Sequence, residues 1–374
     1  MDHPAHEVDV AVVGGGPAGA AAALTLNTYS SLSVALIERS NYQRWRAGES
    51  LSPGIAPLLQ YLGAWDAFLR EEHQPAYGTA AAWGSEELVA RDFLYTAQGQ
   101  GWHLDRRLFD ASLANLAAAR GAHLYSQAAA RSVVLEAGGQ WRLSLRDARM
   151  GAALAVRARF VIDATGSSAA VARRLGARRL VGDHLMGLAG VFQLPTGAST
   201  REAFTTVEAT RDGWWYSTRL PGNQVVAAFM TDPQIIRAQR LHEPSSWLAR
   251  SQATIHLREW LDGAALILGP HVRPAYSQLL DSPCGEGWIA AGEAAVGFDP
   301  LSSIGIGYAL LSGIEAARAV AAALGGREAA LTAYAASIAQ HYGSYRLRQR
   351  AYYLLEQRWP DAPFWARRHA EPGL

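Results

Sequence analysis

The sequence contains no lysine: its 34 basic residues are all arginine, against 33 acidic residues and 11 histidines. Reaction steps that depend on a lysine side chain are therefore not available to this chain. The single cysteine, Cys284, excludes an intramolecular disulfide and a cysteine-rich metal site. It suits a reducing cytoplasm, and we expect a cytoplasmic protein without a metal. The formal net charge of +1 gives no reason to expect nucleic acid or an acidic membrane as a partner.

One long apolar run is present, at residues 10–26, and it could be mistaken for a signal peptide or a membrane helix. Residues 1–9 carry no Lys or Arg, so the basic start of a signal peptide is missing. The run also holds several glycines and Pro17, and we expect no membrane span. Residues 8–13 instead indicate a buried strand, and residues 18–28 a helix of small residues packed close to it. Residues 33–38 form a second apolar strand, which completes a βαβ unit of about 30 residues.

A glycine-rich segment joins the first strand to its helix and reads Gly14-Gly15-Gly16-Pro17-Ala18-Gly19. Gly14 permits a tight turn, Gly16 lets the backbone approach a pyrophosphate, and Gly19 lets the helix pack closely on the strand. Glu38 ends the second strand, 24 positions after Gly14, where a carboxylate would hold a ribose hydroxyl. The unit predicts dinucleotide binding; the alternative is a plain glycine-rich turn.

Two later segments favour FAD over NAD as that dinucleotide. Residues 160–166 form an apolar strand that ends in DATG, with a glycine turn at Gly166. Residues 290–307 contain a short strand, Gly292-Glu293, the sequence DPLSS at 299–303, and a Gly-Ile-Gly that opens a long helix. Backbone N–H groups at that helix start would face the negative edge of a reduced flavin. Glu293 occupies the place where a carboxylate usually bonds a ribityl hydroxyl.

In these motifs and their order, the chain resembles the p-hydroxybenzoate-hydroxylase-like FAD superfamily, and within it the tryptophan halogenases and related monooxygenases. The resemblance also covers residues 46–50 (RAGES), 102–106 (WHLDR) and 213–216 (GWWY). It implies an FAD site in which Arg106 reaches the pyrophosphate. The residues implied for the cofactor are Gly14, Gly16, Pro17, Ala18, Gly19, Glu38, Arg39, Arg46, Arg106, Gly166, Gly292, Glu293, Pro300, Gly305, Ile306 and Gly307. One departure is Glu293, which replaces the usual aspartate and should still reach the ribityl chain.

Halogenases of this type use a lysine on the substrate side and a glutamate within the DPL segment. Here Gly78 stands where the lysine belongs, and Ser302 stands where the glutamate belongs. A small alignment error cannot restore the lysine, because the chain has none. Halogenation by the lysine route is therefore excluded.

The chain then resembles the flavoproteins that hydroxylate tryptophan during quinone cofactor biogenesis, the maturation proteins of lysine ε-oxidase, glycine oxidase and quinohemoprotein amine dehydrogenase. The likeness lies in residues 213–221, 225–232, 299–303 and 305–307. It implies a monooxygenase that hydroxylates an electron-rich aromatic ring through a flavin C4a-hydroperoxide. The substrate would be a tryptophan in a peptide or protein, and the electrons would come from NAD(P)H or from a separate flavin reductase.

A few residues are candidates for chemistry or substrate binding. Glu49 is a candidate acid–base near the flavin; the alternative is a charge at a helix start. Trp214, Trp215 and Tyr216 would line an aromatic pocket and form a stacking wall for the substrate, although residues of a sheet core would look the same. Ser302 takes the position of the family's glutamate beside the flavin.

Single histidines and the arginine-rich tail invite a functional interpretation too. His103 and His184 could act as bases, but a lone histidine is more often a core or surface residue. The basic and aromatic run at 345–359 could be a docking site or a solvated face.

We predict an α/β fold with a Rossmann-like FAD-binding domain of the glutathione-reductase type, an inserted β-sheet substrate domain and a C-terminal helical tail. The FAD domain takes residues 1–75, 100–180 and 279–326, and the substrate domain takes residues 76–99 and 181–278. Residues 327–374 form the C-terminal helices, and residues 54–69 should be one helix. Three other functions stay open: a small-molecule aromatic hydroxylase, a flavin reductase of the geranylgeranyl type, and a non-catalytic FAD-binding chaperone.

Overall fold

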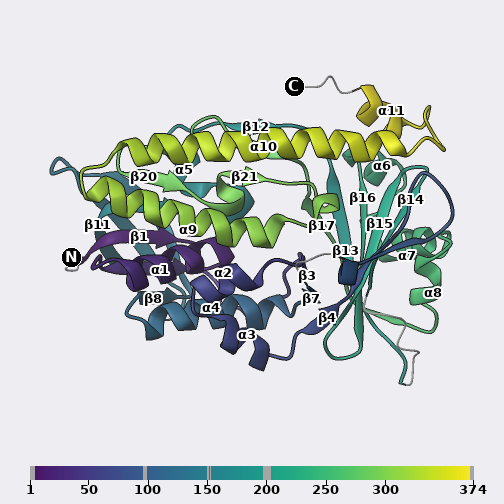
Figure 1. Cartoon of the computed structure of the whole chain (residues 1–374), viewed down its shortest axis with the longest axis horizontal. Helices are drawn as coiled ribbons and strands as arrows, with labels where there is room; N and C mark the ends of the chain where they lie inside the picture. Colours follow the sequence, from purple (N-terminus) through teal and green to yellow (C-terminus); the bar gives the residue numbers. More distant parts are fainter. Residues whose placement is uncertain (1–4, 96–98, 150, 152, 197–203, 371–374) are drawn as a thin grey trace.

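Two β-sheet bodies lie end to end beneath one long helix in the computed structural model, which describes residues 5–95, 99–149, 151, 153–196 and 204–370 (Figure 1). The first body contains the predicted dinucleotide motifs, and the second is the sheet at the opposite end of the molecule. The mixed α/β architecture confirms the predicted fold class.

The first sheet carries the βαβ unit at its centre. Its strands are β1 (His6–Val13), β2 (Val34–Glu38), β8 (His123–Ser126), β11 (Ala153–Asp163), β20 (Trp288–Ala290) and β19 (Cys284–Gly285). All of them run parallel to their neighbours except β19, which is antiparallel to β20. β9 (Ala128–Leu135) and β10 (Trp141–Asp147) form an antiparallel meander with the first part of β11. Because parallel strands share one carboxyl edge, the segments that follow β1, β2, β11 and β20 meet there.

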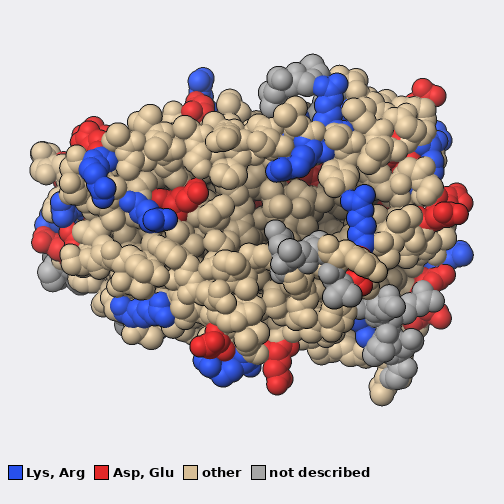
Figure 2. Space-filling view, viewed as in Figure 1, with Lys and Arg blue, Asp and Glu red and all other residues tan. Residues whose placement is uncertain are grey.

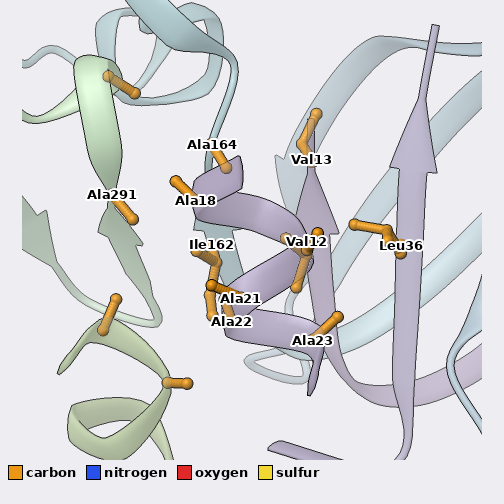
Figure 3. Packing of buried hydrophobic residues seen from close by; sticks show 14 of the residues in the cluster. Val12, Val13, Ala18, Ala21, Ala22, Ala23, Leu36, Ile162, Ala164 and Ala291 are labelled. Atoms are coloured by element: carbon orange, nitrogen blue, oxygen red, sulfur yellow. The ribbon is translucent and has the colours of Figure 1, made fainter. Parts of the chain in front are cut away.

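Small side chains allow the helices to lie close to this sheet. Figure 3 shows Ala18, Ala21 and Ala22 of α1 (Pro17–Tyr29) against Ile162 and Ala164. The long helix α9 (Gly305–Leu324) packs on α1, and a Cβ at Gly313 would lie only 2.2 Å from the carbonyl oxygen of Ala18. Among the described helices, α9 alone is long and apolar enough to cross a membrane; about half of it is buried within the fold.

The segment at residues 54–69 differs from its prediction. It forms two short helices, α2 (Ala56–Tyr61) and α3 (Trp65–Arg70), rather than one. Gly63 lies between them with φ of +58°, a left-handed conformation that ends the first helix. The next helix, α4 (Arg106–Ala119), is capped at its start by Asp105, whose side chain accepts a hydrogen bond from the Arg107 N–H.

The second body is a seven-stranded sheet. In spatial order its strands are β17 (Ala265–Pro274), β13 (Met186–Gln193), β16 (Gln224–Thr231), β15 (Gly213–Leu220), β14 (Phe204–Thr210), β5 (Gly78–Ala82) and β6 (Val89–Asp92). The indole of Trp215 on one face packs with Trp247 of α7 (Pro244–Gln252), beside α6 (Pro233–Ala238) and α8 (Leu257–Trp260). The other face packs against the end of α10 (Ala329–Leu355) and against α11 (Pro363–Ala370), which confirms the predicted helical tail.

Two small sheets join these bodies. One contains β3 (Ser50–Leu51), β7 (Gly101–His103) and β4 (Gln74–Ala76). The other contains β12 (Arg179–Val181), β18 (Gln278–Leu280) and β21 (Val296–Gly297). The surface seen in Figure 2 is hollowed in the middle, between the body that carries α9 and the seven-stranded sheet.

Candidate active site

The start of α1 has the shape that a pyrophosphate requires. Gly14 has φ of +112°, and a Cβ there would lie 2.1 Å from the carbonyl oxygen of Ala164, so only glycine fits. Gly16 is the N-cap residue of α1, which begins at Pro17 and Ala18, and no side chain caps this helix start. A Cβ at Gly16 would meet no atom within 4 Å. The first N–H groups of α1 therefore face open space, as an anion site at a helix start does.

Glu38 lies beside this turn. Its carboxylate is buried and accepts hydrogen bonds from the N–H groups of Gly15 and Ser40, both at 2.8 Å. The carboxylate is thus fixed at the carboxyl end of β2, next to the glycine turn. Its contact with a ribose stays a prediction.

A buried aspartate that we did not select from the sequence organises two of the expected cofactor arginines. Asp110, on α4, accepts hydrogen bonds from Arg106 at both carboxylate oxygens, each at 3.0 Å, and from Arg46 at 2.7 Å. Arg106 also donates to the carbonyl oxygens of Ala47 and Gly48. By contrast, Arg39 is exposed. The sequence does place this aspartate four positions after Arg106, on the apolar face of the same helix.

The second and third glycine motifs meet across the carboxyl edge of the sheet. Gly166 and Gly292 both adopt positive φ, +66° and +62°. The Ser167 N–H donates to the Glu293 carboxylate at 3.2 Å. The Glu293 side chain is exposed, yet the protein atoms around it raise the pKa of its carboxyl, against the Ser167 hydrogen bond and the charge of Arg106. Both observations fit a carboxylate at the wall of a recess.

The segment before α9 forms a second uncapped helix start. No side chain caps α9, and a Cβ at Gly305 would meet no atom within 4 Å. Ile306 is buried, Gly307 lies near Ile55, and Pro300 is exposed. The hydroxyl of Ser302 donates to the carbonyl oxygen of Asp299 at 2.7 Å, so it closes its own turn.

Taken with the start of α1, this second open helix start gives backbone donors at two places along one edge of the sheet. The carboxylates of Glu38 and Glu293 and the arginines held by Asp110 border the same edge. These residues fit FAD: the glycines and arginines would hold the pyrophosphate, and Glu38 and Glu293 would hold ribose and ribityl hydroxyls.

Glu49 and Tyr216, predicted for different roles, are brought together. The Tyr216 hydroxyl donates to Glu49 Oε2 at 3.0 Å, which joins the loop before β3 to β15 of the second sheet. Glu49 is 2 % exposed, and its Oε1 has no hydrogen-bond partner among the described residues. Burial raises the pKa of the Glu49 carboxyl, while the Tyr216 hydrogen bond and the charge of Arg106 oppose that rise. A buried acid with one free oxygen is a strong candidate for proton transfer.

The structure corrects the interpretation of Trp214 and Trp215 as an open aromatic wall. Both indoles are 1 % exposed, on opposite faces of β15. The Trp215 ring stacks on Phe229 at 4.8 Å in the core beneath α7. The Trp214 indole N–H donates to the Tyr353 hydroxyl at 3.0 Å. Both faces of the sheet are covered here, so a run of aromatic residues marks the core rather than a binding surface.

Trp45 is an aromatic candidate that our sequence analysis missed. Its ring is half-buried and lies over the His271 ring, with 6.0 Å between centroids and 27° between planes. It packs in the same cluster as Tyr216, and its indole N–H has no partner among the described residues. The sequence does place this tryptophan between Glu38, the residue expected at the ribose, and Glu49, the candidate acid.

His103 is a buried neutral residue. Its Nε2 lies 2.6 Å from the Thr218 hydroxyl and 3.1 Å from the Thr205 hydroxyl, between the two bodies. Burial lowers the pKa of His103 to about 4, so the ring is uncharged near neutral pH. His184 is exposed.

Comparisons with known proteins agree with FAD as the cofactor. The profile of the FAD binding domain family matches residues 7–240. The putative FAD-dependent oxidoreductase LodB of Marinomonas mediterranea is 31 % identical over 379 residues, with 98 % of each chain covered. The flavin-dependent halogenase armH3 of Armillaria mellea is 27 % identical, over 85 % of this chain and 68 % of that one.

A solved structure shares nearly the whole fold. The peptidyl tryptophan dihydroxylase QhpG, essential for tryptophylquinone cofactor biogenesis, superposes with a TM-score of 0.81 at 27 % identity. The match covers 98 % of this chain and 80 % of that one. The chain therefore belongs to the FAD binding domain family, within the FAD-dependent oxidoreductases that resemble the flavin-dependent halogenases.

Proposed function

We propose that this protein is an FAD-dependent monooxygenase that hydroxylates a tryptophan side chain within a peptide or protein. The observation that carries the proposal is the buried Glu49, which has a free Oε1 and is held by Tyr216 at the junction of the FAD motifs and the second sheet. Ring hydroxylation releases a proton from the ring carbon, and a buried carboxylate beside the ring can accept that proton. The likeness to QhpG supports the choice of a peptide-bound tryptophan, and LodB matches over nearly its whole length.

The proposed reaction converts a ring C–H into C–OH. It consumes one O2, two electrons and two protons, and it releases water. Bound FAD would supply the oxygen-activating chemistry, and the electrons would come from NAD(P)H or from a separate flavin reductase.

The residues of this chain would position the ring and move its proton. Glu49 Oε1 would take the proton that leaves the ring carbon when oxygen is added, and its raised pKa suits that task. Tyr216 keeps the carboxylate in place and remains a donor, because burial and Glu49 raise the pKa of its hydroxyl well above 10. Trp45, half-buried beside Tyr216, would contact the substrate with its ring.

The decisive experiment is a side-by-side assay of free tryptophan, small phenols and a tryptophan-containing partner polypeptide. Each is incubated with the flavin-loaded protein, a reductant and air, and is then examined by mass spectrometry. A gain of about 16 or 32 mass units, one or two oxygen atoms, on the polypeptide supports the proposal. Efficient hydroxylation of a free small aromatic, with no change in any polypeptide, would identify a small-molecule hydroxylase instead.

A further inference from the structure

The inner face of α10 contacts the segment that precedes α9. This helix runs along both bodies of the molecule, from the first sheet to the second (Figure 1). Tyr345, Gln349 and Tyr353 recur at intervals of four residues and therefore share one face. All three reach Asp299, the first residue of the DPLSS segment.

Asp299 is 1 % exposed, and the contacts around it are specific. Its Oδ2 accepts hydrogen bonds from the Tyr353 hydroxyl at 2.7 Å and from the Gln349 amide at 2.9 Å. Its backbone N–H donates to the Tyr345 hydroxyl at 2.7 Å. The other carboxylate oxygen accepts the Leu301 N–H at 2.8 Å, which closes the turn that leads into α9.

Tyr353 also contacts the second sheet. Its hydroxyl accepts the indole N–H of Trp214 on β15 while donating to Asp299. Burial and the charge of Asp299 raise the pKa of Tyr353 well above 10, so the hydroxyl keeps its proton at neutral pH. One side chain thus connects the sheet that carries Tyr216 to the turn at the start of α9.

We propose that α10 acts as a clamp on the Asp299–Ser303 turn. Tyr345, Gln349 and Tyr353 hold this turn in the conformation that FAD binding requires, and Tyr353 couples the turn to the second sheet through Trp214. The three are positioning residues, because their hydrogen bonds go to the turn. The proposal depends on FAD binding alone and is independent of the substrate.

The test compares FAD affinity of matched variants of the full chain. Tyr353→Phe removes the hydroxyl, and Gln349→Leu removes the other donor to the same oxygen. We expect each to weaken FAD binding about three- to tenfold, since one buried hydrogen bond that holds the turn is lost. We also expect faster amide hydrogen exchange at residues 298–304 in the flavin-free protein.

Matched controls come from the same helix and the same aromatic cluster. Tyr352→Phe lies one residue away on the outer face, where Tyr352 is exposed. Trp83→Phe removes an indole N–H that donates to the backbone of Tyr352 rather than to Tyr353. Neither control should alter FAD affinity or the exchange at residues 298–304.

Coupling to the sheet is measured with a double-mutant cycle of Trp214→Phe and Tyr353→Phe. Trp214→Phe should weaken FAD binding although Trp214 lies outside the cofactor motifs. The two effects should be less than additive, because they act through one hydroxyl. Wild-type FAD affinity in both Tyr353→Phe and Gln349→Leu would overturn the clamp, and full additivity in the cycle would overturn the coupling.

Discussion

Gly16 and Gly19 belong to one motif, yet a side chain at Gly16 should affect flavin binding and a side chain at Gly19 should affect the stability of the fold. A Cβ at Gly16 meets no protein atom, whereas a Cβ at Gly19 would lie 1.8 Å from the carbonyl oxygen of Gly14. Gly16→Val should therefore leave a folded protein that has lost its yellow flavin, because the side chain fills the pyrophosphate space. Gly19→Ala should destabilise the fold itself. Flavin absorbance per chain and thermal unfolding of the flavin-free proteins check both outcomes; a folded Gly16→Val protein with one flavin per chain would refute the site.

The Glu49–Tyr216 pair makes a prediction about pH. The Tyr216 hydrogen bond favours the ionised carboxylate, so Tyr216→Phe should raise the pKa of Glu49 further. If Glu49 must be ionised to accept the proton, the acid side of the kcat profile moves to higher pH, and Glu49→Gln abolishes most turnover. Both variants should still bind FAD. Tyr77→Phe, at an exposed tyrosine, serves as the control. An unshifted profile in Tyr216→Phe would exclude Glu49 as the base.

The role that can be assigned to the aromatic residues of β15 depends on which helices cover the two faces of this strand. Trp215 packs with Phe229 and Trp247 on the face beneath α7. We therefore expect Trp215→Ala to lower stability by about 3–5 kcal/mol through the cavity that it leaves. Chemical denaturation measures this loss, and Trp215→Phe, which keeps a ring on Phe229, should cost less. A fully stable Trp215→Ala protein with impaired turnover would restore Trp215 as a substrate contact.

The sequence predicted the elements whose pattern is local and missed what depends on partners far along the chain. The strands β1, β11 and β20 were recognisable from apolar runs that lead into a glycine turn, and β2 from an apolar run that ends at Glu38. The break at Gly63 was not, because the flanking segments have similar apolar patterns. The two faces of β15 could not be told apart either, since helices from distant segments cover both.

In the whole molecule, the cofactor site follows from local sequence motifs, whereas the contacts that hold this site in place do not. The glycine motifs identify the FAD site because parallel strands bring their following turns to one edge. The contacts that fix this edge join distant segments, such as Arg46 to Asp110 and Asp299 to Tyr353. No residue spacing in the sequence predicts those pairs, because they depend on how α4 and α10 pack.

The absence of lysine from the whole chain gives the last prediction: no chloride or bromide is incorporated into any substrate. Several relatives are halogenases, so the fold alone does not exclude that chemistry. In this chain Gly78 lies on β5, packed against Phe204 and the Arg91 backbone, and the Ser302 hydroxyl is bonded within its own turn. Neither residue supplies the amine or the carboxylate of the lysine route. The check is mass spectrometry of indoles and of a tryptophan-containing polypeptide after aerobic turnover in chloride and in bromide. Any halogenated product that requires the protein, reduced flavin and O2 would contradict this prediction and place the chain with its halogenase relatives.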